Sequence, residues 1–163
     1  MAEALLARVR VSRRFRGLRA VSNVSFDVPA GHIVALIGPN GAGKTTLFNL
    51  VSGSLAADSG EIRLAGKRID GLRPDQVCAA GIGRTFQLVK PFAGLSVLDN
   101  VVVGALARTA SVRSARDKAF AILARLGLAD RCHVAASALT LPDRKRLEVA
   151  RALATEPRVL LRD

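Results

Sequence analysis

The sequence contains no tryptophan or tyrosine, so its six phenylalanines are its only aromatic residues. Proteins that bind single-stranded nucleic acid stack bases on aromatic side chains, and this scarcity argues against that class. No uninterrupted apolar run reaches the length needed to cross a membrane. The first eight residues also lack a signal-peptide pattern. We therefore expect a cytoplasmic chain that does not itself enter the bilayer.

Cysteine is also rare, with only Cys78 and Cys132 present. The two lie far apart in the sequence and match no metal-binding or redox spacing. We expect both to be reduced thiols, in the core or at the surface, which fits a cytoplasmic compartment.

Basic residues greatly outnumber acidic ones, and the formal net charge is +12. A charge of this size is compatible with nucleic acid, an anionic membrane surface or an acidic protein partner. The basic residues are spread from Arg8 to Arg162 and form no single stripe. We therefore expect no nucleic-acid partner, and proximity to an anionic lipid surface fits at least as well.

The most informative stretch is a glycine-rich segment that matches the pattern G-x-x-x-x-G-K-[ST]. The apolar residues 33–37 before it predict a buried strand, and residues 46–51 after it predict the start of a helix. Glycines let the backbone approach a ligand closely, and successive N–H groups can then form a cradle for phosphate. The residues expected to bind the nucleotide are Gly38, Pro39, Asn40, Gly41, Ala42, Gly43, Lys44, Thr45 and Thr46.

Two side chains of this segment carry the chemistry of a phosphate site. The ammonium group of Lys44 can reach the β- and γ-phosphates, and the hydroxyl of Thr45 can ligate Mg²⁺. ATP and Mg²⁺ are therefore the expected ligands.

The rest of the sequence predicts alternating strands and helices, as in an α/β fold. We expect an edge strand over 5–11, a turn over 12–17, and strands over 20–28, 61–64 and 81–87. Helices are expected over 73–80, 96–108, 113–126 and 143–154, and a further buried strand begins at 158. Ser96 is the expected cap of one helix, and Gly127 ends the next. That helix is expected to bury Ala119, Phe120, Ile122, Leu123 and Leu126.

Together these motifs resemble the nucleotide-binding subunit of an ABC transporter. The resemblance implies a P-loop NTPase fold with a β-rich ATP-binding core over 1–87 and 157–163 and a helical subdomain over 88–156. It also implies that Phe15 stacks on adenine and that Gln87 reaches Mg²⁺ or the attacking water. Lys44 and Gln87 are then the expected catalytic residues.

The family's signature loop, L-S-G-G-Q, precedes the helix that contains Arg144 to Ala154. In this sequence the corresponding residues are Leu139, Thr140, Leu141, Pro142 and Asp143. Thr140 keeps the hydroxyl, whereas both glycines and the glutamine are replaced. Pro142 removes one backbone N–H, and Asp143 brings negative charge to a loop that contacts phosphate in the family, although it could cap the helix instead.

The run that ends at Asp163 resembles the Walker B strand, whose aspartate holds Mg²⁺ through water. Arg162 stands where the family has an apolar residue. The metal residues implied by the resemblance are Thr45, Gln87 and Asp163. The resemblance implies a domain that is truncated at Asp163, with its C-terminal part, including the catalytic glutamate, missing.

Residues 83–104 resemble the branched-chain amino acid importers within the family. The resemblance implies an ATPase that powers uptake of such a solute from the inner face of the cell membrane. The implied partners are a second ATP-binding subunit in a homo- or heterodimer, transmembrane permeases and, indirectly, a solute-binding protein. Two alternatives stay open: a truncated nucleotide-binding fragment without hydrolysis, and a soluble nucleic-acid-associated ATPase of the same fold.

Overall fold

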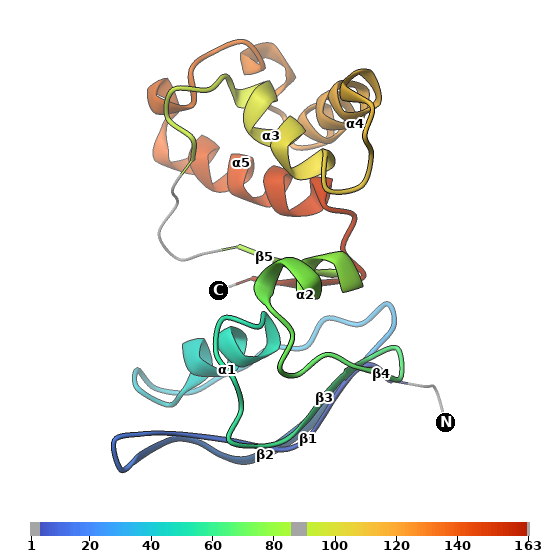
Figure 1. Ribbon diagram of the computed structural model, residues 1–163. Helices are drawn as coiled ribbons and strands as arrows, with labels where there is room; N and C mark the ends of the chain where they lie inside the picture. The colour runs from blue at the N-terminus through green and yellow to red at the C-terminus, as the bar shows by residue number, and fades with distance from the viewer. Residues whose placement is uncertain (1–3, 86–90, 163) are drawn as a thin grey trace. The chain divides into compact units, whose positions relative to one another are not determined.

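The computed structural model describes residues 4–85 and 91–162. The chain divides into two compact units, Met1–Ala80 and Gly81–Asp163. The first unit contains an antiparallel sheet and the glycine loop, and the second contains a short parallel strand pair and a helical bundle (Figure 1). The predicted division into a core and a helical subdomain over 88–156 stays a prediction.

The first unit is built on a four-stranded antiparallel sheet in the order β2-β1-β3-β4. Its strands are β1 (Ala4–Phe15), β2 (Leu18–Pro29), β3 (Ser59–Leu64) and β4 (Lys67–Arg68). The prediction of an edge strand over 5–11 is wrong, because β1 pairs with both β2 and β3. Several register shifts interrupt β1 and weaken its alternation, which is why the sequence resembles an edge.

The predicted turn over 12–17 is shorter than expected. Strand β1 continues to Phe15, and only Arg16 and Gly17 form the turn, both with positive φ angles of 44° and 91°. Phe15 therefore lies at the end of a strand, directly paired with Leu18.

Two helices belong to the first unit, α1 (Lys44–Val51) and α2 (Pro74–Ala80). Figure 1 shows α1 lying over one face of the sheet. The core combines apolar side chains of the strands with those of α1 and α2. Its fully or nearly fully buried members include Leu6, Val11, Val21, Leu47, Leu50, Val51, Ile62, Leu64 and Val77.

The apolar run before the glycine loop does not form the predicted buried strand. Residues 33–37 have no regular secondary structure, and Ile33 and Ile37 are almost completely exposed. A strand requires a neighbour to satisfy its N–H and C=O groups, and no strand in the described part of the chain pairs with this run. An apolar run is buried as a strand only where a neighbouring strand pairs with it.

The second unit contains the parallel pair β5 (Ile82–Arg84) and β6 (Val159–Leu161). The N–H group of Thr85 extends the ladder by donating to the Leu161 carbonyl at 2.9 Å. Arg162 follows the end of β6 and is exposed, so its charge does not enter the buried part of the strand.

Three helices form the bundle: α3 (Val97–Ala105), α4 (Val112–Arg125) and α5 (Leu141–Ala154). Two short 3₁₀ helices, η1 (Ala129–Arg131) and η2 (Ala136–Ala138), lie between α4 and α5. The predicted cap is confirmed, since the Ser96 hydroxyl accepts from the Asp99 N–H at 3.0 Å. Gly127 follows the end of α4 with a φ of 69°, as expected.

One core prediction for α4 is wrong. Ala115, Ala119 and Leu123 are completely buried at a spacing of four residues, whereas Phe120 is 49% exposed. Phe120 is turned by about 100° from Ala119 around the helix, which takes it off the buried face. The small alanines let α4 approach its neighbours closely.

No described helix is both long and apolar enough to cross a membrane. No disulfide joins Cys78 and Cys132. Cys132 is buried in the helical core and Cys78 is half-buried on α2.

Candidate functional site

At two positions of the glycine loop the backbone has a conformation that strongly favours glycine. Gly41 and Gly43 have φ angles of 83° and 84°, in the left-handed region that L side chains rarely adopt. A Cβ atom on Gly43 would also overlap the backbone carbonyl oxygen of Ala20 on β2. The loop is therefore pressed against the sheet, and helix α1 begins at the next residue, Lys44.

The side chain of Lys44 folds back across this loop. Its ammonium group donates to the carbonyl oxygens of Gly38 at 2.6 Å and Pro39 at 2.8 Å. An ammonium group has three donors, so one remains for a further acceptor. In the described part of the chain no carboxylate forms an ion pair with Lys44. This positive charge is therefore available to a bound anion.

The N-terminus of α1 also favours a bound anion. The first turn has no acidic residue and no side-chain cap, so its backbone N–H groups and its dipole are not neutralised from within the helix. The adjacent Thr45 is exposed and supplies a hydroxyl oxygen.

These donors suit a phosphate ligand with Mg²⁺. Magnesium prefers oxygen ligands and is commonly held by substrate phosphates together with one or two protein oxygens. The described residues contain no cluster of three or more His, Cys, Asp or Glu that could hold a metal by itself. The Thr45 hydroxyl fits such a shared site.

The predicted adenine platform, Phe15, is 39% exposed at the end of β1. The guanidinium of Arg13 lies 5.1 Å from the centre of its ring. Arg13 is held there by Asp58, whose carboxylate accepts from it at 2.7 Å. The ring is thus supported by a cation while part of it stays accessible to a flat base.

The sequence alone did not identify Arg13 as part of this site. Arg13 lies two residues before Phe15, so both side chains lie on the same face if this segment is a strand. The sequence predicted a turn over 12–17 instead, and a turn does not place alternate side chains on one face.

Gln87 and Asp163, two of the predicted metal and catalytic residues, lie outside the described residues. The described segment that follows residue 90 is fixed to α3 by Asn100, which is completely buried. Its side chain accepts from the Phe92 N–H at 2.9 Å and donates to the carbonyls of Phe92 at 3.0 Å and Ser96 at 2.9 Å. Sequence reasoning also missed Asn100, although an amide inside an apolar helix face is a recognisable signal.

The altered signature loop forms the start of α5. Thr140 is the N-cap, and its hydroxyl accepts from the Asp143 N–H at 3.4 Å. Pro142 lies in the first turn, where a missing N–H costs little. The helix therefore begins at Leu141, two residues earlier than the sequence predicted.

Asp143 is surrounded by donors of its own chain. Its carboxylate accepts from the Thr140 hydroxyl at 2.9 Å, from Arg131 at 3.0 Å and from Arg146 at 3.4 Å. The carboxylate of Asp143 thus lies at the N-terminus of α5. A carboxylate at this position stabilises the helix N-terminus, and the two arginines neutralise its charge.

The glycine loop, the lysine and the following helix define a P-loop nucleotide-binding protein. The family model described as "ABC transporter" matches residues 21–163. The chain belongs to the ABC transporter family, as an ATP-binding subunit.

Curated relatives support this assignment over the whole chain. The "High-affinity branched-chain amino acid transport ATP-binding protein LivG" of Escherichia coli (strain K12) is 38% identical over 178 aligned positions, covering 100% of this chain and 70% of LivG. BraF of Pseudomonas aeruginosa, with the same description, is 34% identical with the same coverage. The "Sulfate/thiosulfate import ATP-binding protein CysA" of Acinetobacter baylyi is 39% identical over 160 positions, covering 94% of this chain and 44% of CysA.

Solved structures confirm the fold. A nucleotide-free ATP-binding cassette from an ABC transporter superimposes with a TM-score of 0.87 at 31% identity, covering 99% of this chain and 69% of that one. The ADP conformation of an ATP-binding cassette gives a TM-score of 0.86 at 31% identity, with 98% and 68% covered. The predicted α/β P-loop fold of the ABC ATPases is therefore confirmed.

Proposed function

We propose that this ATP-binding subunit powers the import of branched-chain or related amino acids. The observation that carries the proposal is the glycine loop pressed onto β2, with the Lys44 ammonium group bridging its carbonyls and one donor left over. Such a loop binds phosphate through backbone N–H groups and the lysine. The proposed solute is inferred from LivG and BraF, because both are described as branched-chain amino acid transport ATP-binding proteins.

ATP binds with its phosphates in the glycine loop and its adenine against Phe15. Residues 38–46 wrap the phosphates, and Lys44 exchanges part of its contact with Gly38 and Pro39 for phosphate oxygens. Thr45, Gln87 and Asp163 would hold Mg²⁺, which would supply neutralisation of the phosphate charge. Arg13 lies over the Phe15 ring and helps to hold it in place for stacking.

In hydrolysis, water attacks the γ-phosphorus, the bond to the β-phosphate oxygen breaks, and ADP and phosphate are the products. Lys44 stabilises charge that spreads over the phosphate oxygens, and Gln87 orients the water. Both roles rest on positioning rather than on covalent chemistry.

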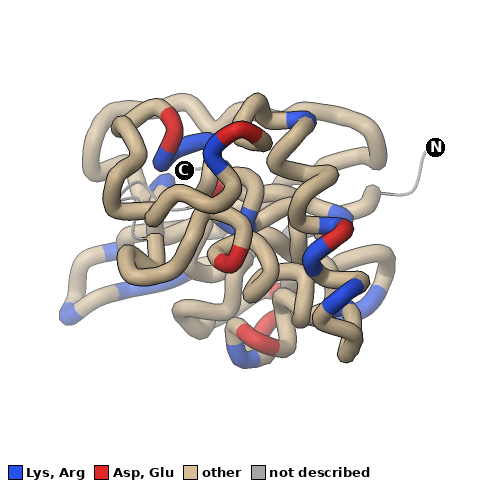
Figure 2. The backbone as a smooth tube through the Cα atoms, turned by 90° about the horizontal axis from the view of Figure 1, so that it is seen from above, with Lys and Arg blue, Asp and Glu red and all other residues tan. Residues whose placement is uncertain are grey.

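Transport requires other subunits. A second ATP-binding subunit, identical or different, faces the first head to tail, so that each glycine loop meets the partner's signature loop. Transmembrane permeases receive the motion of the pair at the inner face of the cell membrane, and a solute-binding protein delivers the amino acid. Nucleic acid is not a proposed partner; Figure 2 shows Lys and Arg at many places along the chain, several of them beside Asp or Glu.

The solute is tested by uptake in cells that carry the gene with a Lys44→Ala substitution. The proposal predicts loss of labelled leucine, isoleucine and valine uptake, with ribose and sulfate uptake unchanged. The comparison solutes matter because importers for sulfate and ribose also match this chain. Unchanged leucine uptake combined with loss of another solute would reassign the transporter.

A further inference from the structure

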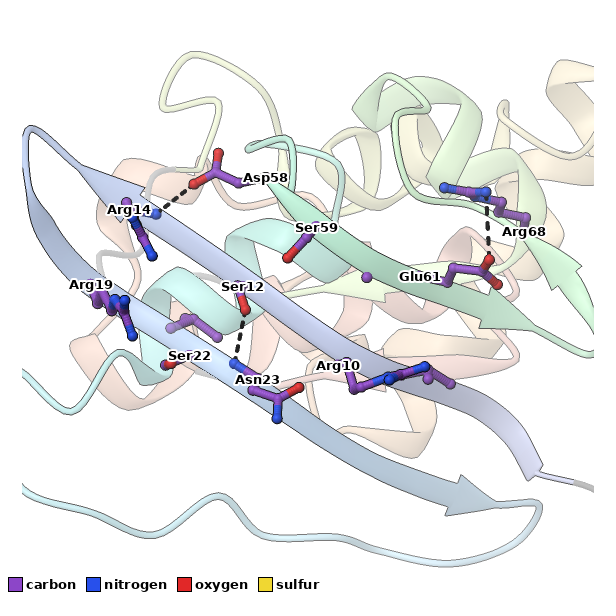
Figure 3. Close-up of a pocket in the computed structure, with 13 residues that line it drawn as sticks. Arg10, Ser12, Arg14, Arg19, Ser22, Asn23, Asp58, Ser59, Glu61 and Arg68 are labelled. Atoms are coloured by element: carbon purple, nitrogen blue, oxygen red, sulfur yellow. Dashed lines mark hydrogen bonds and ion pairs between the residues drawn. The ribbon is translucent and has the colours of Figure 1, made fainter.

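A groove lies on the outer face of the antiparallel sheet, opposite helix α1 (Figure 3). It encloses about 830 Å³ and is lined by residues of β1, β2 and β3, together with Asp58 and Arg68. This volume falls within the range of roughly 300–1,000 Å³ typical of small-molecule sites. The glycine loop contributes no residue to its lining.

The groove contains a pair of like charges that the fold holds together. Arg14 on β1 and Arg19 on β2 are directly paired across the two strands. Both line the groove, and Figure 3 shows their side chains near each other at one end of it. Both residues are exposed, and like charges opposite each other on neighbouring strands repel. An anion between the two guanidinium groups would remove this repulsion.

Within the described residues, no carboxylate forms an ion pair with either guanidinium. The nearest candidate, Asp58, accepts from the guanidinium of Arg13 and from the backbone N–H of Arg14, each at 2.7 Å. The other acid of the lining, Glu61, pairs with Arg63 at 2.7 Å and with Arg68 at 3.7 Å. Both acids of the groove are thus already neutralised by other groups.

Further polar and basic side chains line the groove beside this pair. Arg10 also lines it, and its backbone is held at a φ of 48°, with its N–H donating to the Ser25 hydroxyl at 2.8 Å. Asn23, on the neighbouring strand, has a φ of 50°, and its N–H donates to the Ser12 hydroxyl at 2.9 Å. Non-glycine residues rarely adopt this conformation, and such positions concentrate at ligand sites.

We propose that this groove binds a phosphate-bearing anion between Arg14 and Arg19, at a site separate from the nucleotide loop. Guanidinium groups form paired, charge-assisted hydrogen bonds with phosphate oxygens, and an anion at this position removes the repulsion between the two arginines. The phosphate belongs either to a soluble compound or to the headgroup of an anionic lipid.

The test uses the chain with Lys44→Ala, which removes the nucleotide loop as a competing phosphate site. One arm titrates inorganic pyrophosphate by calorimetry. The other measures co-sedimentation with phosphatidylglycerol vesicles, with phosphatidylcholine vesicles as the neutral comparison. Binding to pyrophosphate identifies a soluble ligand, and binding to the anionic vesicles alone identifies a lipid.

The deciding variant combines Arg14→Ser with Arg19→Thr in one chain. The control variant is Arg73→Ser. Arg73 lies outside the groove and is paired with Asp75 at 2.8 Å. Its removal lowers the net charge by one without touching the site, so its charge-matched comparison is the single Arg19→Thr variant. The double variant should weaken binding by at least about tenfold, the effect of losing hydrogen bonds to a charged group. If the double variant does not fold, the single Arg19→Thr variant, at an exposed strand position, is used in the same binding measurements. Absence of binding in both arms, or an equal loss in Arg73→Ser, would overturn the proposal.

Discussion

Replacing Gly43 with alanine should damage the nucleotide loop far more than the same change at Gly41. Both residues have nearly the same φ, 84° and 83°, so both variants carry the same left-handed strain of about 1–2 kcal/mol. A glycine-to-alanine change also restricts the unfolded chain, which offsets about 0.4–1 kcal/mol of that strain. The net cost from conformation alone is therefore about 0–1.5 kcal/mol at either position.

The two positions differ in what surrounds the new methyl group. At Gly41 no atom lies within 4 Å of it, whereas at Gly43 it would overlap the Ala20 carbonyl oxygen. The overlap involves backbone on both sides, so neither partner can rotate away. Forcing an extra carbon into a packed position costs about 1–3 kcal/mol. Gly43→Ala should thus lose about 1–3 kcal/mol more stability than Gly41→Ala.

Urea unfolding without nucleotide, followed by circular dichroism, measures this difference. Nucleotide must be absent, because ligand binding stabilises the folded state by mass action. Equal losses at the two positions, within about 0.5 kcal/mol, would show that the loop is not pressed onto β2 as described.

Other predictions concern the base platform, the segment before α3, the signature loop and acid stability. Phe15→Ala should weaken ATP binding by about 1–3 kcal/mol and leave inorganic triphosphate unaffected; calorimetry with both ligands decides, and equal losses would exclude stacking. Asn100→Ala should cost about 2–4 kcal/mol by removing bonds from a buried amide and should speed hydrogen exchange at the Phe92 N–H; unchanged exchange would contradict its anchoring role. Replacing residues 141–143 with Gly-Gly-Gln in a full-length version should increase ATP-dependent dimerisation in light scattering, and no increase would mean that the altered residues do not weaken the dimer. The backbone N–H of Arg14 and the guanidinium of Arg13 lower the pKa of Asp58 below its ordinary 3.8. Its stabilisation is therefore complete above that value and is lost as the pH falls through the lower, folded-state pKa. Asp58→Asn should flatten the loss of stability below about pH 4, and an unchanged pH profile would refute the pairing.

The sequence predicted the glycine loop and most elements because each depends on local chemistry. A segment of about ten residues contains the glycine spacing, Lys44 and the start of the following helix, so the motif is recognisable locally. Ser96 at a helix start and Gly127 at a helix end are equally local signals.

The errors concern relations between distant residues. The run 33–37 is apolar, but its exposure follows from the absence of a pairing strand in the described structure, which no local pattern reveals. The place of β1 in the middle of the sheet depends on β3, about fifty residues away. The support of Phe15 by Arg13 and Asp58 joins two strand ends that the sequence does not show to be neighbours.

Residues 38–46 form the proposed ATP site, and Lys44 supplies its positive charge. The most direct measurement is calorimetric titration of Mg-ATP into the chain, into Lys44→Ala, and into Lys67→Ala as a control at an exposed lysine on β4. Lys44→Ala should lose at least about a hundredfold in ATP affinity, because two charge-assisted phosphate contacts disappear, while Lys67→Ala should bind normally. Unchanged ATP affinity in Lys44→Ala would show that this loop is not the ATP site.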